Sequence, residues 1–147
     1  MERFGNSAAH RMQQVFATRL VRSTDLQSVL DCVLEGGLEL TGATLGNVQL
    51  MDGESGFLTI AAQRGFNDEF LDFFQRVNAD HSSACGRALR QQRAIVIRDV
   101  KADEDFAPCV AIAERAGFRS VQSTPIFEQW SRFRHPVNAL SGSSPAE

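Results

Sequence analysis

The most regular pattern of hydrophobic positions in the chain is a stripe at helical spacing between residues 26 and 38. The apolar residues of this stripe recur every three or four positions: Leu26, Val29, Leu30, Val33, Leu34 and Leu38. Thr24 and Gln27 have the spacing of a capping box, and Gly42 suits the left-handed position that ends a helix. The sequence therefore predicts an amphipathic helix whose apolar face must pack against another element.

A second apolar pattern of approximately helical spacing precedes this helix, from His10 to Arg22. Its apolar members are Met12, Val15, Phe16, Leu20 and Val21. We expect a lead-in helix within residues 1–22. It would form an N-terminal amphipathic helix pair with the helix that follows.

Alternation of apolar and polar residues predicts strands farther along the chain. Residues 47–51 alternate, residues 52–56 supply turn residues, and residues 58–62 alternate again. This arrangement predicts an antiparallel hairpin. Two further apolar runs, at residues 94–100 and 118–127, predict additional strands.

Helix signals separate these strands. Asn67 offers an N-cap, and the residues after it that are expected to face the core are Phe70, Phe73, Phe74 and Val77. A short helix is expected at residues 84–91. A third helix has an acidic start from Asp103, Pro108 in its first turn, and Gly117 as its stop.

Together these elements predict an α+β fold: a single domain over residues 23–127 with one mostly antiparallel central sheet covered by helices. Residues 128–147 form a divergent C-terminal segment. Within it, residues 137–141 can supply one strand, whereas residues 141–147 have the composition of a disordered tail. The alternative is a module truncated or altered at its C-terminus, which would leave unpaired strand edges.

Composition limits the classes of partner. A formal net charge of -3 and a pI of about 5.6 give no basic footprint for nucleic acid or for an anionic membrane. No apolar run is long enough to cross a bilayer or to form a secretion signal, so we expect a cytoplasmic protein. The three cysteines are expected to be free thiols. His10, His81 and His135 lack metal-ligand spacing, so no metal site is expected.

Several linked segments carry a resemblance to a known family. They are the hairpin region Leu50–Arg64, the run Cys85-Gly86-Arg87-Ala88-Leu89, the strand end Asp99-Val100, and the run from Ala116 to Ile126. In their order and residue sequence these segments resemble the GAF domain, a small-molecule-binding sensory module of bacterial signalling proteins. Such proteins include those associated with histidine kinases of two-component systems. The resemblance implies ligand-gated signalling rather than catalysis. It also implies a homodimer that passes its signal to a partner protein or to its dimer mate.

The resemblance implies a ligand pocket between the sheet and its covering helices. The residues that it assigns to the pocket, carried over by segment and by strand parity, are Phe74, Cys85, Asp99, Phe106, Cys109, Gln122 and Thr124. Such a pocket would combine apolar walls with a few converging polar groups. Ligand binding would shift the helix at residues 26–38 against its dimer mate.

Other functions remain open at this point. One alternative is a module that has lost its ligand and serves only for dimerisation. Cys85 and Cys109 lie near helix starts, where amides and the helix dipole lower a thiol pKa, although both are equally suited to be packed small residues. The pair is similar to that of free methionine-R-sulfoxide reductases, GAF enzymes with one cysteine in a Cys-Gly segment and another after an Asp-Val strand end. This chain lacks the Gly-His-Ile-Ala-Cys-Asp run of those enzymes.

A covalently bound bilin is a further alternative. Cys109 lies about where phytochrome-like GAF domains attach this chromophore, and it is the residue that would carry it. Those domains usually place His after the cysteine, whereas Val110 follows here, and the chain contains no Tyr to line a chromophore pocket.

Overall fold

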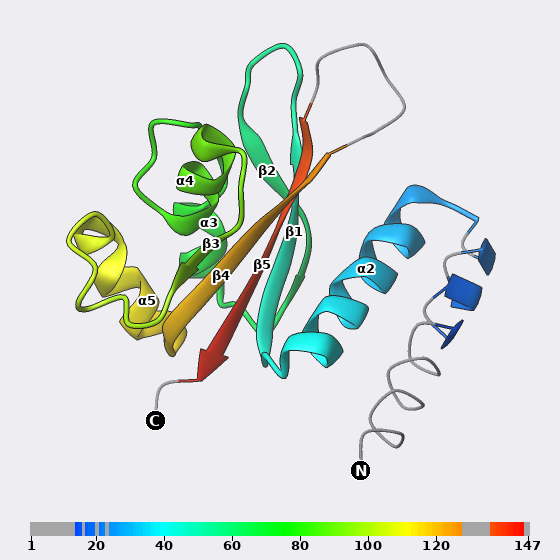
Figure 1. The fold of residues 1–147 in the computed structure, drawn as a ribbon, viewed down its shortest axis with the longest axis horizontal. Coiled ribbons are helices and arrows are strands. Elements are labelled where there is room, and N and C mark those ends of the chain that lie inside the picture. The colour runs from blue at the N-terminus through cyan, green and yellow to red at the C-terminus, as the bar shows by residue number, and fades with distance from the viewer. Residues whose placement is uncertain (1–13, 16, 20, 23, 128–135, 146–147) are drawn as a thin grey trace.

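The computed structural model describes residues 14–127, except residues 16, 20 and 23, and residues 136–145 (Figure 1). Its elements in chain order are α2 (Leu26–Thr41), β1 (Leu45–Met51), β2 (Leu58–Arg64), α3 (Asp68–Phe73), α4 (Ala84–Gln91), β3 (Ile95–Ile97), the 3₁₀ turn η1 (Ala107–Cys109), α5 (Val110–Ala116), β4 (Phe118–Phe127) and β5 (Pro136–Pro145). The strands form one five-stranded sheet in the order β2-β1-β5-β4-β3, with antiparallel neighbours throughout. The predicted α+β fold with a mostly antiparallel sheet is confirmed.

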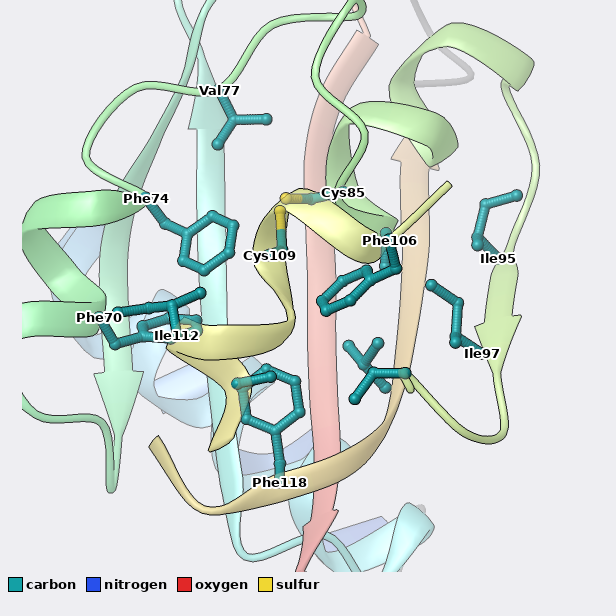
Figure 2. Packing of buried hydrophobic residues seen from close by; sticks show 14 of the residues in the cluster. Phe70, Phe74, Val77, Cys85, Ile95, Ile97, Phe106, Cys109, Ile112 and Phe118 are labelled. Carbon is teal, nitrogen blue, oxygen red and sulfur yellow. The ribbon is translucent and has the colours of Figure 1, made fainter. Parts of the chain in front are cut away.

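The sheet separates two layers of helices (Figure 1). On one face, Leu30 and Leu34 of α2 pack against Val48 and Ala62 of the hairpin. The other face carries α3, α4 and α5, and the larger hydrophobic core lies between these helices and the sheet (Figure 2). The site described below lies in this second layer.

Helix α2 begins one residue later than the capping box predicts. Asp25, not Thr24, is the N-cap, and its Oδ1 accepts a hydrogen bond of 2.9 Å from the Ser28 amide. A carboxylate is a stronger acceptor than a hydroxyl at the positive end of a helix dipole, which accounts for the correction. Gln27 instead donates to Asp31 Oδ1 and to the Ala61 carbonyl. The helix ends at Gly42 in the left-handed region, as predicted.

The apolar stripe of α2 is buried along only part of its length. Leu30 and Leu34 are buried, whereas Leu26, in the first turn, is 63% exposed. Before α2, residues 14–15, 17–19 and 21–22 have helical backbone, in agreement with the predicted lead-in helix. The remainder of that predicted helix lies outside the described residues.

Strand β5 completes the centre of the sheet. It pairs with β1 on one side and β4 on the other, and it includes the predicted strand segment 137–141. The strand continues to Pro145, so the expectation of a disordered tail is wrong for residues 141–145. Backbone amides and carbonyls form the hydrogen-bond ladder of a sheet irrespective of the side chains. A serine- and glycine-rich segment can therefore act as the central strand between two strands that need partners.

The helices over the second face begin at side-chain caps. Asn67 caps α3, accepting a 2.9 Å bond from the Phe70 amide, and Ser83 caps α4, accepting from the Gly86 amide. Phe70 and Phe74 are buried as expected, but Phe73 is 44% exposed and packs by its edge against Phe74 and the half-buried His81 ring. The six-residue α3 turns only one side toward the core, so three phenylalanines in five positions cannot all be buried there.

The third predicted helix is shorter than its acidic start suggests. Residues 101–106 form turns, Pro108 lies in the 3₁₀ turn η1, and α5 begins at Val110. The helix ends at Gly117, whose φ of 86° lies in the left-handed region. Across the described part of the chain, no helix combines the length and hydropathy that crossing a bilayer requires.

Candidate ligand-binding site

A small cavity lies between the sheet and the layer formed by α3, α4 and the η1 segment. Its lining residues are Asn47, Gln49, Phe66, Phe70, Phe74, Ser83, Ala84, Cys85, Phe106, Phe118 and Val121. Five of these are phenylalanines, and Figure 2 shows Phe74, Phe106 and Phe118 around the same interior space. The volume is about 20 Å³, which is room for roughly one water molecule.

Two carboxamides on β1 are among the polar groups of this cavity. Asn47 and Gln49 are two residues apart, so their side chains leave the strand on the same face, opposite Val48. They are 2% and 1% exposed, and Asn47 Oδ1 and Gln49 Oε1 have no hydrogen-bond partner. A buried acceptor without a partner costs about 1–3 kcal/mol. The cavity therefore presents two unpaired acceptor oxygens among aromatic walls.

A hydrogen-bonded chain leads from the cavity toward the surface at the start of α4. Ser83 Oγ lies 3.1 Å from Cys85 Sγ and 2.8 Å from His81 Nδ1. The Ser83 amide also donates to His81 Nδ1 over 3.2 Å, which makes that nitrogen the unprotonated one. Burial lowers the pKa of His81, favouring its neutral form. The hydrogen-bonded series of His81, Ser83 and Cys85 is therefore uncharged.

The Cys-Gly pair at the start of α4 has a packing explanation. A Cβ built at Gly86 would collide with the backbone carbonyls of His81 and Asn78. Glycine is therefore needed for α4 to approach the 78–81 segment. This close approach places Cys85 at the cavity wall.

The cysteines do not have the lowered thiol pKa expected of residues near helix starts. Burial raises the pKa of Cys85, and this effect outweighs hydrogen bonds from Ser83, the Gly86 amide and Gln49, which lower it. Burial also raises the pKa of Cys109, against a lowering bond from Ser82, and the neighbouring Cys85 charge raises it further. Desolvation of the thiolate thus exceeds the stabilisation from the helix start. Both thiols are protonated at neutral pH.

The Phe106 wall of the cavity is fixed by an ion pair. Asp103 Oδ1 accepts from the Phe106 amide over 2.9 Å and from Arg87 Nη1 over 2.8 Å. The Arg87 and Asp103 side chains are only 15% and 23% exposed. Because Arg87 belongs to α4, this pair ties the turn that carries Phe106 to the helix that carries Cys85.

The predicted pocket residues divide into two groups. Phe74, Cys85 and Phe106 line the cavity. Cys109 is fully buried, and its sulfur faces that of Cys85 in Figure 2, but it does not line the cavity.

Three predicted pocket residues lie away from the cavity. Asp99 forms a surface ion pair with Arg119, with Arg119 Nη2 2.8 Å from Asp99 Oδ2. Gln122 is exposed and donates to Thr124 Oγ1. On β4 the inward side chains are those of Val121 and Ser123, so the parity carried over from the family resemblance is displaced by one residue.

Asn47 and Gln49 were not predicted as site residues. Their alternation with Val48 and Leu50 indicates a strand, and that pattern normally has its polar side in water. The signal that they are buried is indirect, since enough helices follow the hairpin in the sequence to cover both faces of the sheet.

A larger open groove of about 770 Å³ runs along the edge strand β2 between α2 and α3. Its lining mixes polar and apolar side chains, and none of the buried polar atoms without a partner belongs to it. Within the described part of the chain, no group of His, Cys, Asp and Glu side chains could hold a metal ion. The small cavity behind β1 is therefore the better candidate for a binding site.

The fold and the cavity define a class of protein, namely an α+β domain that encloses a small space between an antiparallel sheet and a layer of helices. A model of the family described as GAF domain matches residues 23–132. Because this match spans most of the chain, the chain belongs to the GAF domain family. Membership places it in a general class of sensory and regulatory modules.

Solved structures share this fold at low sequence identity. The GAF domain of a phosphoenolpyruvate-protein phosphotransferase from Coxiella burnetii is 15% identical, with a TM-score of 0.73, over 92% of this chain and 76% of that chain. Free methionine-R-sulfoxide reductase from Neisseria meningitidis, in complex with its substrate, is 21% identical, with a TM-score of 0.67, over 90% of this chain and 70% of that chain. A methyl-accepting chemotaxis protein, residues 122 to 287, is 20% identical, with a TM-score of 0.63, over 92% of this chain and 82% of that chain. Comparison with curated proteins finds no match.

Proposed function

We propose that this chain is a cytoplasmic sensory module that binds a small ligand in the cavity behind β1 and passes a conformational signal to a partner protein or a dimer mate. A bacterial pathway of the two-component, histidine-kinase-associated kind fits this role. The observation that carries the proposal is the pair of unpaired, buried acceptor oxygens on Asn47 and Gln49. A purely structural core would be expected to avoid them, because each lowers stability without a partner.

The position of β1 provides a route for the signal. Asn47 and Gln49 face the cavity, while Val48, between them, packs against Leu30 and Leu34 of α2. A ligand bonded to the two carboxamides would therefore act on the strand that supports α2. Two large apolar side chains of α2, Leu26 and Leu40, are 63% and 71% exposed and offer apolar surface to a dimer mate. A ligand can shift this arrangement only by its differential affinity for the two states.

The burial of the thiols favours binding over catalysis. Cys85 and Cys109 are 6% and 0% exposed, and burial raises the pKa of both. A bilin on Cys109 would need space that the packed core around its sulfur does not provide. One observation supports the alternative of a thiol reductase: the sulfur atoms of the two cysteines face each other in Figure 2. Replacing both cysteines with serine tests it, because only a thiol enzyme must lose methionine sulfoxide reduction.

The test of the proposed function is retention of a small molecule by the cavity. The full chain would be incubated with the small-molecule fraction of a bacterial extract, desalted, and measured by native mass spectrometry. We expect added mass on the wild-type chain and on the exposed-site control Gln122→Met, and its loss in the double variant Asn47→Leu, Gln49→Met. Equal retention by wild type and double variant, or no retention by any of them, contradicts the proposal.

The oligomeric state tests the route of the signal. We expect a dimer in analytical ultracentrifugation, with Leu40→Glu shifting it toward monomer while helical content is unchanged. A ligand-free dimer that never binds a small molecule would support the alternative of a dimerisation module. A wild-type chain that stays monomeric at micromolar concentration contradicts a dimer relay and leaves a separate partner protein as the receiver.

A further inference from the structure

The chemistry of the cavity indicates the class of ligand. We propose that it takes an uncharged molecule with a flat, apolar body and at least two hydrogen-bond donors, the class to which dihydroxybenzenes and donor-rich heteroaromatic compounds belong. This inference rests on the proposed function, because both concern the same cavity. It goes further by excluding ionised ligands, nucleotides and other phosphates included.

The need for donors follows from the two carboxamides. The atoms that lack a hydrogen-bond partner are the side-chain oxygens of these residues, and their amide nitrogens are not among the buried unpaired atoms. Two residues along a strand correspond to about 6.7 Å, so the two acceptor oxygens require two separate donors on one ligand.

The need for a neutral ligand follows from the rest of the wall. Among the described residues that line the cavity, none is charged. The ion pair of Arg87 and Asp103 lies outside the cavity lining, and its two charges face one another. An ionised ligand would leave water without gaining a counter-charge, and that transfer is far more costly than burying a neutral hydrogen-bonded group.

The flat, apolar body follows from the phenylalanines. Phe66 and Phe70 stack with ring centroids 3.7 Å apart, and Phe118 meets both rings by its edge. Phe74 and Phe106 complete the wall from other segments of the chain. Aromatic rings favour a ligand that can continue stacked or edge-to-face contacts.

A ring-sized ligand must displace part of the wall, because the cavity itself has only about 20 Å³. Four of the five rings lie outside the strands, and two of these four stand at the ends of short elements. Phe74 stands at the end of the six-residue α3, and Phe106 stands on the turn before η1. Displacing Phe106 would also strain its link through Asp103 to Arg87.

Three probes of similar size separate the claims about donors and charge. Resorcinol carries two hydroxyl donors on a ring, m-cresol replaces one hydroxyl with a methyl group, and 3-hydroxybenzoate replaces it with a carboxylate. Each would be titrated into the uniformly ¹⁵N-labelled full chain, with the side-chain amide signals of Asn47 and Gln49 followed by NMR. For so small a ligand we expect resorcinol to bind with a Kd on the order of 1 mM. We expect m-cresol and 3-hydroxybenzoate to bind roughly tenfold more weakly.

The variant Gln49→Met provides the internal control. With an apolar side chain in place of the acceptor, the preference should reverse and m-cresol should bind better than resorcinol, a result that a general loss of folding would not produce. Gln122→Met, an exposed site on β4, should behave as wild type.

Three results overturn the inference. The first is tighter binding of 3-hydroxybenzoate than of resorcinol. The second is equal binding of resorcinol and m-cresol both by the wild-type chain and by Gln49→Met. The third is no binding of any probe, which would mean that the carboxamides hold a buried water only. A charged molecule retained from the extract at the Asn47 and Gln49 site would overturn the ligand class while supporting the proposed function.

Discussion

At the scale of single residues, the chain keeps polar groups where apolar ones would be more stable. Gln49 is 1% exposed with an unpaired oxygen, in a core otherwise built from phenylalanine and aliphatic side chains. Proteins commonly give up stability at binding sites in this way. The position is therefore one where a stabilising substitution should cost function.

Gln49→Met tests this trade. The substitution keeps the side-chain volume and removes the unpaired acceptor. We expect the ligand-free chain to gain about 1 kcal/mol in its free energy of unfolding, equivalent to roughly 2–4 °C in Tm, measured by urea and thermal denaturation. Gln122→Met is the matched control and should change little. A loss of stability would show that Gln49 is satisfied in solution.

The two buried thiols should make stability depend on pH on the alkaline side. Burial raises the pKa of Cys85 and Cys109 above that of an unfolded thiol, which is about 8.5. The folded state therefore holds its protons longer, so the contribution is complete below that value and is lost as pH rises through the folded pKa. We expect the free energy of unfolding to fall as pH rises above about 8.5. The variant Cys85→Ala, Cys109→Ala should show a shallower fall, and an equal slope would contradict the raised pKa.

At the scale of elements, the main link between α4 and the turn that carries Phe106 is the Arg87–Asp103 pair. Its side chains are mostly buried, and Arg87 Nε already has no partner. The pair therefore holds a helix and a cavity wall in one arrangement, while the surface pair of Asp99 and Arg119 links only exposed groups.

Asp103→Asn should consequently be costly. The amide oxygen can still accept from the Phe106 amide, but Arg87 loses its counter-charge, and we expect a loss of about 1–3 kcal/mol in urea denaturation. Asp99→Asn is the matched control and should have a clearly smaller effect, because water screens an exposed pair. Equal losses in the two variants would mean that the buried pair has no special structural role.

The helices and strands could largely be predicted from sequence, whereas the side of each strand that faces the helix layer could not. Caps and stops such as Asn67 and Gly117 act locally, so their signals are readable. The orientation of β4 is a tertiary property, because an alternating strand shows two equivalent faces until a helix layer covers one. For that reason the family resemblance assigns Gln122 and Thr124 to the pocket instead of Val121. Asn47 and Gln49 were missed for the same reason.

At the scale of the whole molecule, the sheet depends on its C-terminal strand. Without β5, the strands would form two separate pairs, β2 with β1 and β4 with β3, each with an unpaired edge. Isolated two-strand units are marginal in water and prone to pairing with other chains. The sequence indicates this strand only over residues 137–141, because the serine-rich remainder of β5 contributes through its backbone.

Truncation tests the dependence. A chain that ends at Phe127 should lose cooperative unfolding and elute as aggregate in size-exclusion chromatography, whereas a chain that ends at Pro145 should behave as the full chain. A truncated form that unfolds cooperatively as a monomer would show that β5 is dispensable.

The same topology places a demand on synthesis in the cell. β1 ends at Met51 and β5 begins at Pro136, so the ribosome must complete β2, the layer of α3, α4 and α5, β3 and β4 before the second neighbour of β1 exists. Until then the nascent chain carries an open strand edge beside a cluster of phenylalanines, which is a target for chaperones. Pairing across such a sequence distance is slow. Synonymous codons that slow translation just before β5 should therefore lower the soluble yield, although they leave the protein sequence unchanged.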